Sequence, residues 1–290
     1  METKLARIET ALAAIVSREL DGIPESMAAP IRSSVLSPGK RIRPLLVLAA
    51  YEGTGGTSAE VATLACAAEM VHAYSLVHDD LPCMDNDVLR RGQPTLHVRY
   101  GEAAAAVAGA ALMPMAVRTV LSAGEAMRLP DECVRRLLLT LTEASGASGM
   151  VGGQLLDLRA EGRRVSAETL EQIHTGKTAQ LIAACVVMGG LAAGADDGTI
   201  ERLRQFGLRL GLAFQAVDDI LDVTGSDVEL GKPSGRDRDL AKATYPAVLG
   251  MDGAEHMSRR LATAALSELD ELSGADELRN MAVYVIERRW

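Results

Sequence analysis

The hydrophobic and polar positions of this chain follow the period of an α-helix almost from end to end. Glycine and proline interrupt the pattern, for example at Pro38-Gly39 and at Pro130. No run has the two-residue alternation and β-branched enrichment of a strand. We expect one all-α domain over residues 1–290, with helices at 3–20, 40–52, 57–80, 100–123, 130–150, 167–192, 198–222, 239–250, 254–273 and 275–288.

The composition agrees with a soluble helical protein. Of the 290 residues, 48% are hydrophobic, which is enough for a sizeable core, and only 3% are aromatic. This alanine-rich composition favours closely packed helices over a β-sandwich. Two apolar runs, 103–117 and 178–195, are rich in Ala and Gly rather than Leu and Ile, and the first is too short to span a bilayer. Because such helices also occupy the centre of large helical proteins, we expect no membrane insertion.

The charge and the cysteines limit the partners and the compartment. The net charge of -9 disfavours nucleic acid, which needs a clustered basic surface, and an anionic ligand would need local cations or metal ions. The first twenty residues carry both acidic and basic side chains, unlike a signal peptide. The four cysteines form no CxxC pair and are expected to be reduced thiols in the cytoplasm.

A pair of aspartates in 214-FQAVDDILDVTG-225 suggests a cation site. Asp218 and Asp222 are four residues apart, so on a helix they share one face and repel each other. A bound cation would relieve this repulsion, although acidic pairs also occur on solvated helix faces.

A second acidic segment, 76-LVHDDLPCMDNDVLRRG-92, has a less regular spacing. Asp79 and Asp85 would point about 120° apart on a continuous helix. Pro82 breaks the helix between them, and an outward loop there would return Asp85 to the face of Asp79. Two such motifs are far more specific than one. Carboxylates without a matching Cys or His set favour Mg²⁺, which bridges phosphate oxygens, over zinc.

Basic residues in the segments between helices supply the other half of a phosphate site. Lys177 lies between apolar stretches, so it must find an acceptor. We interpret Arg41, Arg236 and Arg238 as surface residues. The candidate phosphate ligands are Lys40, Arg43, Arg90, Arg91, Lys177, Lys232 and Lys242.

These segments together resemble the motifs of one family. GKRIRP, HAYSLVHDDLPCMDND, LRRG, GGQLLD, HTGKT, FQAVDDILD and GKPSGRDRDLAKATYP are similar, in order and spacing, to those of trans-isoprenyl diphosphate synthases, most closely bacterial-type farnesyl diphosphate synthases. The resemblance covers residues 30–288. It implies the isoprenoid synthase fold, about ten core helices around a deep central cavity, and a homodimer.

The resemblance also implies a role for each matching residue. Two Mg²⁺ ions would be held by Asp79 and Asp85 and a third by Asp218, supported by Asp80 and Asp222. Isopentenyl diphosphate would be bound by Gly39, Lys40, Arg43, His72 and Arg91. The allylic diphosphate would be held by Arg90, Lys177, Lys232 and Lys242. The oxygens of Thr178 and Gln215 would face the developing cation, and Gln154 and Asp157 would line the same cavity.

Such a site explains a reaction without a protein nucleophile. Metal ions and basic side chains neutralise a leaving diphosphate, and an apolar cavity protects the allylic cation from water. The double bond of isopentenyl diphosphate then attacks, and the released diphosphate is expected to take the proton. The product is five carbons longer than the allylic substrate.

Tyr74 is the candidate for limiting product length. It lies five residues before Asp79, where its ring resembles the plug that stops growth at fifteen carbons, which predicts farnesyl diphosphate. If Tyr74 is ordinary core, a geranylgeranyl or geranyl product becomes possible. We interpret His78 as a helix-packing histidine.

The chain departs from the family pattern at Pro38, Val88 and Ala110, none of which is a predicted metal or phosphate ligand. Two other functions remain open. A terpene cyclase is disfavoured by the low aromatic content and the second set of cations. A non-catalytic subunit of a heteromeric synthase is disfavoured because both aspartate motifs are intact.

Overall fold

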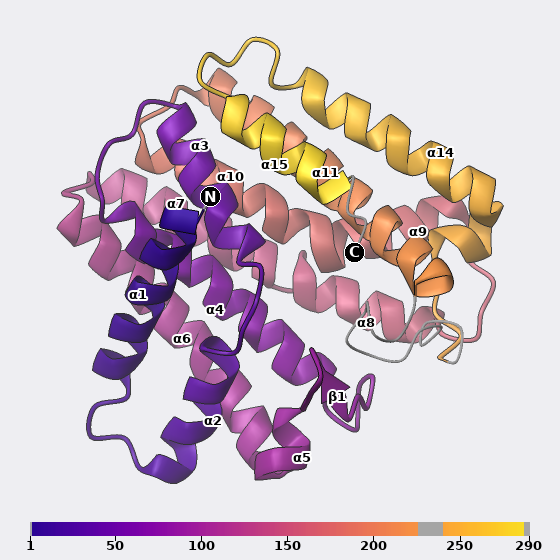
Figure 1. The fold of residues 1–290 in the computed structure, drawn as a ribbon, viewed down its shortest axis with the longest axis horizontal. Helices are drawn as coiled ribbons and strands as arrows, with labels where there is room; N and C mark the ends of the chain where they lie inside the picture. The colour runs from indigo at the N-terminus through magenta and orange to yellow at the C-terminus, as the bar shows by residue number, and fades with distance from the viewer. Residues whose placement is uncertain (1, 226–239, 287–290) are drawn as a thin grey trace.

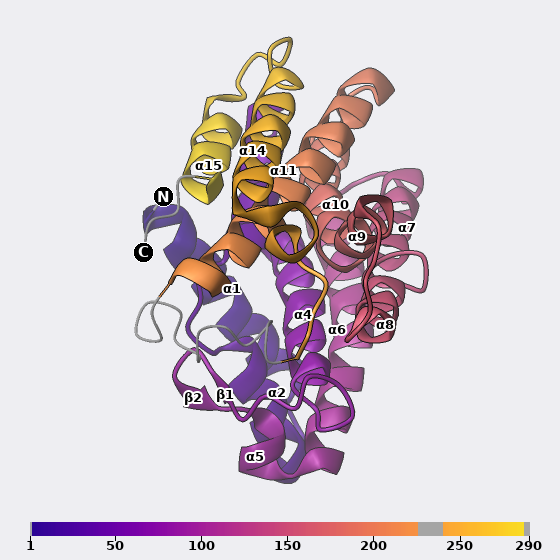
Figure 2. The same cartoon turned by 90° about the vertical axis from the view of Figure 1, so that its right-hand side faces the viewer.

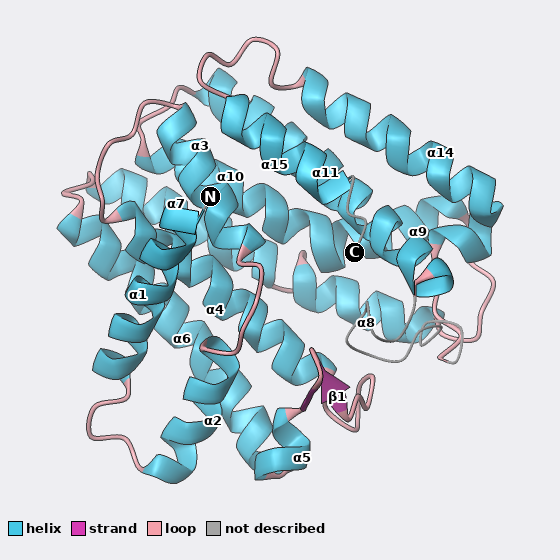
Figure 3. Ribbon diagram, viewed as in Figure 1, coloured by secondary structure: helices cyan, strands magenta, loops and turns pink. Residues whose placement is uncertain are grey.

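The computed structural model describes residues 2–225 and 240–286, and helices make up most of them (Figure 1). The helices are α1 (Glu2–Glu19), α2 (Glu25–Val35), α3 (Ile42–Gly53), α4 (Val61–Asp79), α5 (Leu96–Tyr100), α6 (Glu102–Ala126), α7 (Asp131–Ser145), α8 (Met150–Ala160), α9 (Ala167–His174), the π-helical turn η1 (Thr175–Ala179), α10 (Gln180–Ala192), α11 (Asp197–Thr224), α14 (Tyr245–Ser267) and α15 (Asp276–Ile286). Two-residue strands, β1 (Leu89–Arg90) and β2 (Gln93–Pro94), pair antiparallel between α4 and α5 (Figure 3). The predicted all-α fold is confirmed.

The sequence pattern misses three helices, α2, α5 and α8. Pro30, which suggested a break, lies inside α2, and Gly152 and Gly153 lie inside α8, so both helices accommodate residues of low helix propensity. Tertiary packing overrides weak local propensity at these places. The helix predicted at 130–150 is wrong in its second part, because α7 ends at Ser145 and α8 begins at Met150.

The C-terminal helices agree with the prediction in part. The break expected between helices at 239–250 and 254–273 is present within α14 as a kink at Gly250, whose φ of 74° is not helical. Residues 240–244 precede this helix instead of forming its first turn. Thr244 caps α14, its hydroxyl accepting from the N–H of Ala247, and Pro246 stands in the first turn, where a missing N–H costs nothing.

The core is centred on α4 and α10. Every residue of α10 from Leu181 to Ala192 is buried, and the helix packs against α3, α7 and α11. α4 packs against α3 and α6, and Figure 2 shows the long helices running in roughly one direction. By length and composition, Glu102–Ala126 and Ala167–Ala192 could each cross a membrane. Core helices meet the same criteria, and 78% of the apolar window of Ala167–Ala192 is buried inside the protein.

Glycine lets the core helices approach closely. A Cβ on Gly207 of α11 would lie 2.4 Å from the Cα of Ala183 in α10, and one on Gly189 of α10 would lie 2.4 Å from the carbonyl oxygen of Val47 in α3. The neighbouring atoms are largely backbone, so they cannot yield as a flexible side chain would. The spacing of these helices therefore depends on the missing side chains.

The Gly207→Ala variant should lower the free energy of unfolding by about 1–3 kcal/mol, because the added methyl group overpacks the α10–α11 contact. Chemical denaturation measures this. Gly198→Ala, in the first turn of the same helix, is the matched control, since its Cβ would meet only the side-chain oxygen of Asp196 at 3.2 Å. Equal stability of the two variants would contradict the packing argument.

Candidate active site

A cavity of about 720 Å³ lies between the C-terminal parts of α4 and α11. Its wall also includes the loop before α3, β1, α8, η1 and residues 240–244. Cavities of this size and wall composition bind small molecules. Most of the predicted site residues line it, including Lys40, Arg43, His72, Asp79, Asp85, Arg90, Arg91, Gln154, Asp157, Lys177, Thr178, Gln215, Asp218, Asp222 and Lys242, together with Gly39.

The outward loop predicted around Pro82 is confirmed. α4 ends at Asp79, and residues 82–84 are exposed. The backbone N–H of Asp85 then donates to the carbonyl oxygen of Asp79 at 2.9 Å, which brings the two residues together at the cavity wall. Burial and the neighbouring carboxylate of Asp85 raise the pKa of Asp79 to about 6, although Lys177 acts in the opposite direction.

α11 brings the second aspartate motif to the same cavity through Asp218 and Asp222. The residue between them, Asp219, is buried and has structural partners. It accepts from the side-chain amide of Gln215 at 2.9 Å and from the backbone N–H of Tyr245 at 2.8 Å. His174 Nε2 lies 3.3 Å from Asp219 Oδ2, the oxygen that accepts from Tyr245.

Thr178 and Gln215, predicted to act together, are in direct contact. The Thr178 hydroxyl donates to Gln215 Oε1 at 2.8 Å, and Asp219 holds the other end of that amide. Asp219 and His174 were not predicted from the sequence as site residues. The adjacent aspartates of the DDILD segment were the available signal for Asp219, and no comparable signal marks His174.

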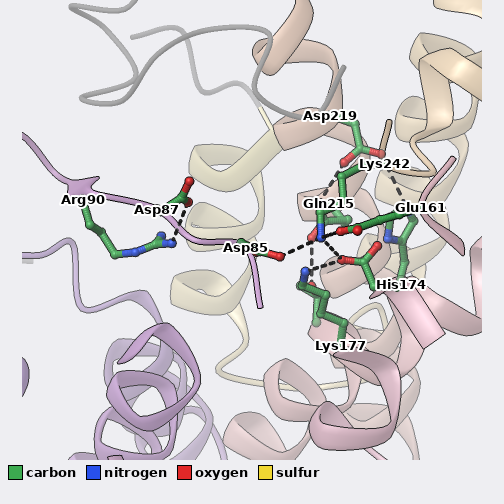
Figure 4. Close-up of polar contacts among 11 residues, drawn as sticks. Asp85, Asp87, Arg90, Glu161, His174, Lys177, Gln215, Asp219 and Lys242 are labelled. Carbon is green, nitrogen blue, oxygen red and sulfur yellow. Dashed lines mark hydrogen bonds and ion pairs between the residues drawn. The ribbon is translucent and has the colours of Figure 1, made fainter. Parts of the chain in front are cut away.

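Two lysines meet at one carboxylate, as Figure 4 shows in part. Lys177 Nζ donates to Asp157 Oδ2 at 2.6 Å, and Lys242 Nζ lies 3.1 Å from the same oxygen. Lys242 also contacts Asp85 and Glu161, each at 2.8 Å. Although burial opposes it, the two lysines hold the pKa of Asp157 below its usual value. The acceptor expected for Lys177 is thus present.

The glycines of the GGQ and HTGKT segments explain how α8 reaches Lys177. A Cβ on Gly153 would lie 2.1 Å from the backbone nitrogen of Lys177, and one on Gly176 would lie 3.0 Å from the Cα of Gly153. The two backbones are therefore in contact where α8 crosses η1. π-Helical turns of this kind often occur at functional sites.

The two adjacent arginines have separate surroundings. Arg90 donates to Asp80 at 2.7 Å, whereas Arg91 Nη1 donates to the carbonyl oxygen of Pro38 at 2.7 Å. A Cβ on Gly39 would lie 2.5 Å from Arg91 Nη1. Burial, followed by nearby arginines including Arg43 and Arg91, lowers the pKa of His72 well below its usual value, so this imidazole is neutral.

Two other predicted site residues, Asp80 and Tyr74, are not among the described residues that line the cavity. Asp80 is the buried counter-ion of Arg90. The ring of Tyr74 packs against that of His78 with centroids 4.7 Å apart, while Ser75 and Leu76 face the cavity. His78 Nε2 donates to the carbonyl oxygen of Ala106, which confirms its helix-packing role.

The surface interpretation of Arg41 is wrong. Its residue exposure is 4%, and its guanidinium is paired with Glu69 and Glu9. Lys232, Arg236 and Arg238 lie outside the described residues. Of the departures from the family pattern, Val88 and Ala110 are exposed, and Pro38 supplies the carbonyl that Arg91 binds.

The donor atoms fit Mg²⁺. Asp79, Asp85, Asp218 and Asp222 bring only carboxylate oxygens to the cavity. Among the residues described, no three His, Cys, Asp or Glu side chains converge into a complete metal site. Mg²⁺ usually binds one or two protein carboxylates and completes its coordination with water and phosphate.

A profile of the Polyprenyl synthetase family matches residues 24–281. The chain belongs to this family of trans-isoprenyl diphosphate synthases. The synthetase is 43% identical to the farnesyl diphosphate synthase of Bacillus subtilis (strain 168) over 83% of this chain and 81% of that protein. It is 45% identical to a chloroplastic geranylgeranyl pyrophosphate synthase of Catharanthus roseus over 89% of this chain and 71% of that protein.

Solved structures agree with this assignment. A geranyltransferase from Helicobacter pylori, complexed with magnesium and isoprenyl diphosphate, has a TM-score of 0.84 at 32% identity, over 98% of each chain. An FPP/GFPP synthase from Zymomonas mobilis has a TM-score of 0.86 at 32% identity, also over 98% of each chain. The synthetase is thus a prenyltransferase with the all-α isoprenoid synthase fold, which confirms the family expected from its motifs.

Gln154 provides a test of the cavity wall. Its residue exposure is 8%, and neither atom of its side-chain amide has a hydrogen-bond partner among the described residues. Gln154→Met should therefore raise the free energy of unfolding by about 1 kcal/mol, because an unsatisfied buried polar group is removed. The same variant should lose activity if the amide contacts substrate. Denaturant titration and a turnover assay check both effects, and lower stability would contradict the first.

Proposed function

We propose that this synthetase condenses isopentenyl diphosphate head to tail with dimethylallyl or geranyl diphosphate, yielding farnesyl diphosphate and free diphosphate. The observation that carries the proposal is the meeting of both aspartate motifs with Lys177 and Lys242 around one cavity. A second cationic group, Lys40, Arg43 and Arg91, lines the same cavity beside Gly39. A site for two diphosphates needs both groups.

The acidic residues would bind magnesium. Asp79 and Asp85 would bind two ions, and Asp218 would bind a third, with Asp222 beside it. Asp80 would support the site through its ion pair with Arg90. When bound, Mg²⁺ neutralises charge on the departing diphosphate. Lys177, Lys242 and Arg90 would bind the allylic diphosphate, as would Lys232, which lies outside the described residues.

The remaining residues would orient the reacting carbons. The oxygens of Thr178 and Gln215 would face the allylic cation, and their mutual hydrogen bond supports a fixed position for both. Lys40, Arg43, His72 and Arg91 would hold isopentenyl diphosphate while its double bond attacks. The neutral state of His72 suits a hydrogen-bonding role, and the released diphosphate would accept the proton.

A geranylgeranyl product is the second candidate. It is favoured by the position of Tyr74 outside the cavity lining and by the 45% identity to a geranylgeranyl pyrophosphate synthase. The farnesyl product is favoured by the 43% identity to the Bacillus relative and by the position of Tyr74 on α4, five residues before Asp79.

We further propose a homodimer in the cytoplasm. Exposed residues of α6 recur every three or four positions at Val107, Ala110, Pro114, Arg118 and Leu121, of which only Arg118 is charged. Such a stripe suits the interface between two copies of an all-helical protein. The unpaired thiols support a reducing compartment.

The decisive assay supplies isopentenyl diphosphate with dimethylallyl or geranyl diphosphate and measures product length with and without Mg²⁺. Chain elongation should require the metal. Asp79→Ala should reduce kcat by about 10³-fold, because metal ions supply several kcal/mol of charge stabilisation. Asp131→Ala, an exposed carboxylate on α7, is the control. Absence of elongation by the wild-type protein would overturn the proposal.

Tyr74→Ala should lengthen the main product beyond fifteen carbons, because the proposed limit is the bulk of the Tyr74 ring, and its loss would let the cavity extend past Ser75 along α4. Chromatography of the hydrolysed products measures the distribution. Tyr284→Ala, an exposed tyrosine on α15, is the matched control. An unchanged distribution, or a wild-type product of twenty carbons, would remove Tyr74 as the limit.

The dimer can be tested by light scattering coupled to gel filtration. The wild-type protein should run with twice the chain mass of 30.6 kDa. The double variant Val107→Glu/Leu121→Glu should shift it to the monomer, because two charges per chain would be buried at the interface. A monomeric wild-type protein would refute the dimer.

A further inference from the structure

Arg41 is a buried arginine in an uncommon backbone conformation. It precedes the first turn of α3 with φ 49°, in the left-handed region, and its side chain is 2% exposed. A non-glycine residue adopts this conformation only where its surroundings hold it. Arg41 lines the cavity, as do the nearby cations Lys40 and Arg43.

All three nitrogens of the Arg41 guanidinium donate to the protein itself. Nε donates to Glu9 of α1 at 2.8 Å, and Nη1 donates to Glu69 of α4 at 2.6 Å. Nη2 donates to the carbonyl oxygen of Ser37 at 2.8 Å, in the same loop. The side chain therefore joins α1 and α4 to the loop formed by residues 37–41.

The loop is also held from its other side. Arg91 donates to the carbonyl oxygen of Pro38, and its close approach requires the absence of a Cβ at Gly39. Pro38 thus contacts one arginine while Ser37 contacts another. The position of Lys40 depends on both contacts, because the loop lacks helical hydrogen bonds of its own until α3 begins.

Glu69 is the buried acidic partner of Arg41. Its side chain is 5% exposed, and it lines the cavity among cations that would bind an anion. A carboxylate there opposes diphosphate binding by simple electrostatics. Its pairing with Arg41 accounts for its presence, since a buried arginine without a partner would be costly.

We propose that Arg41, held by Glu69 and Glu9, is a positioning residue that fixes the 37–41 loop and so shapes the pocket for isopentenyl diphosphate. This rests on the proposed function, in which Lys40 and Arg43 bind that substrate. Arg41 itself makes no contact with the substrate in this scheme, because its guanidinium is committed to α1, α4 and Ser37.

Glu69→Gln separates positioning from electrostatics, because the two predict opposite signs. If Glu69 positions the loop through Arg41, the KM for isopentenyl diphosphate should rise about three- to tenfold, as a charged hydrogen bond becomes a neutral one. If the charge alone matters, this KM should fall. The KM for geranyl diphosphate and kcat should stay unchanged under positioning.

Arg41→Lys should act in the same direction, because a lysine keeps the charge but donates from a single nitrogen and cannot match the planar spread of the three Arg41 nitrogens. Glu52→Gln, on the far part of α3, is the matched control and should leave every constant unchanged. Thermal unfolding shows whether each variant is folded. If Arg41→Lys does not fold, Glu69→Gln alone decides.

A lower or unchanged KM for isopentenyl diphosphate in Glu69→Gln would overturn the positioning role, as would an equal loss for both substrates. Failure of the proposed function has a different signature. Lys40→Ala would then leave the KM for isopentenyl diphosphate unchanged, or the wild-type protein would not condense the two substrates at all.

Discussion

The carboxylate of Asp157 joins three separate parts of the chain through the two lysines that it holds. Lys177 comes from η1, Lys242 from the segment before α14, and Asp157 itself from α8. Lys242 extends the connection to Asp85 beyond α4. Without these pairs, partly buried charges of one sign would face each other across the cavity, at a cost that helix packing alone would have to offset.

This shared ion pair requires close contact between backbones. Lys177 reaches Asp157 because Gly153 and Gly176 let α8 approach the π-helical turn. Asp219 anchors α11 to the start of α14 and holds the amide of Gln215, which also accepts from the hydroxyl of Thr178 beside Lys177. The polar groups of the site thus hold one another in place. The apolar helices behind them hold the backbone segments that carry these groups. Such mutual support keeps charged groups in place before a ligand arrives.

Much of the site was predictable because its charged residues belong to short local sequence motifs. The spacing of Asp218 and Asp222 indicates one helix face, and Pro82 explains how Asp85 returns to Asp79. The acceptor of Lys177 could be expected but not identified, since Asp157 is distant in sequence and becomes its neighbour only by folding. Glu161 and Glu69 were missed for the same reason, because nothing near them in the chain marks an ionic partner. Arg41 was misread as exposed because its partners lie on α1 and α4.

Periodicity and motif order are local properties, so the helical class, the family, the two acidic motifs and most of the basic residues around them could be predicted from the sequence. Which of these side chains face the cavity, and which support them, depends on the tertiary structure. In the folded protein, Asp80 pairs with Arg90, and Tyr74 packs against His78. The backbones of α8 and η1 are in contact at their glycines. Burial and ion pairing depend on neighbours that distant helices supply. A helical period predicts the direction of a side chain but does not identify the residues that it contacts.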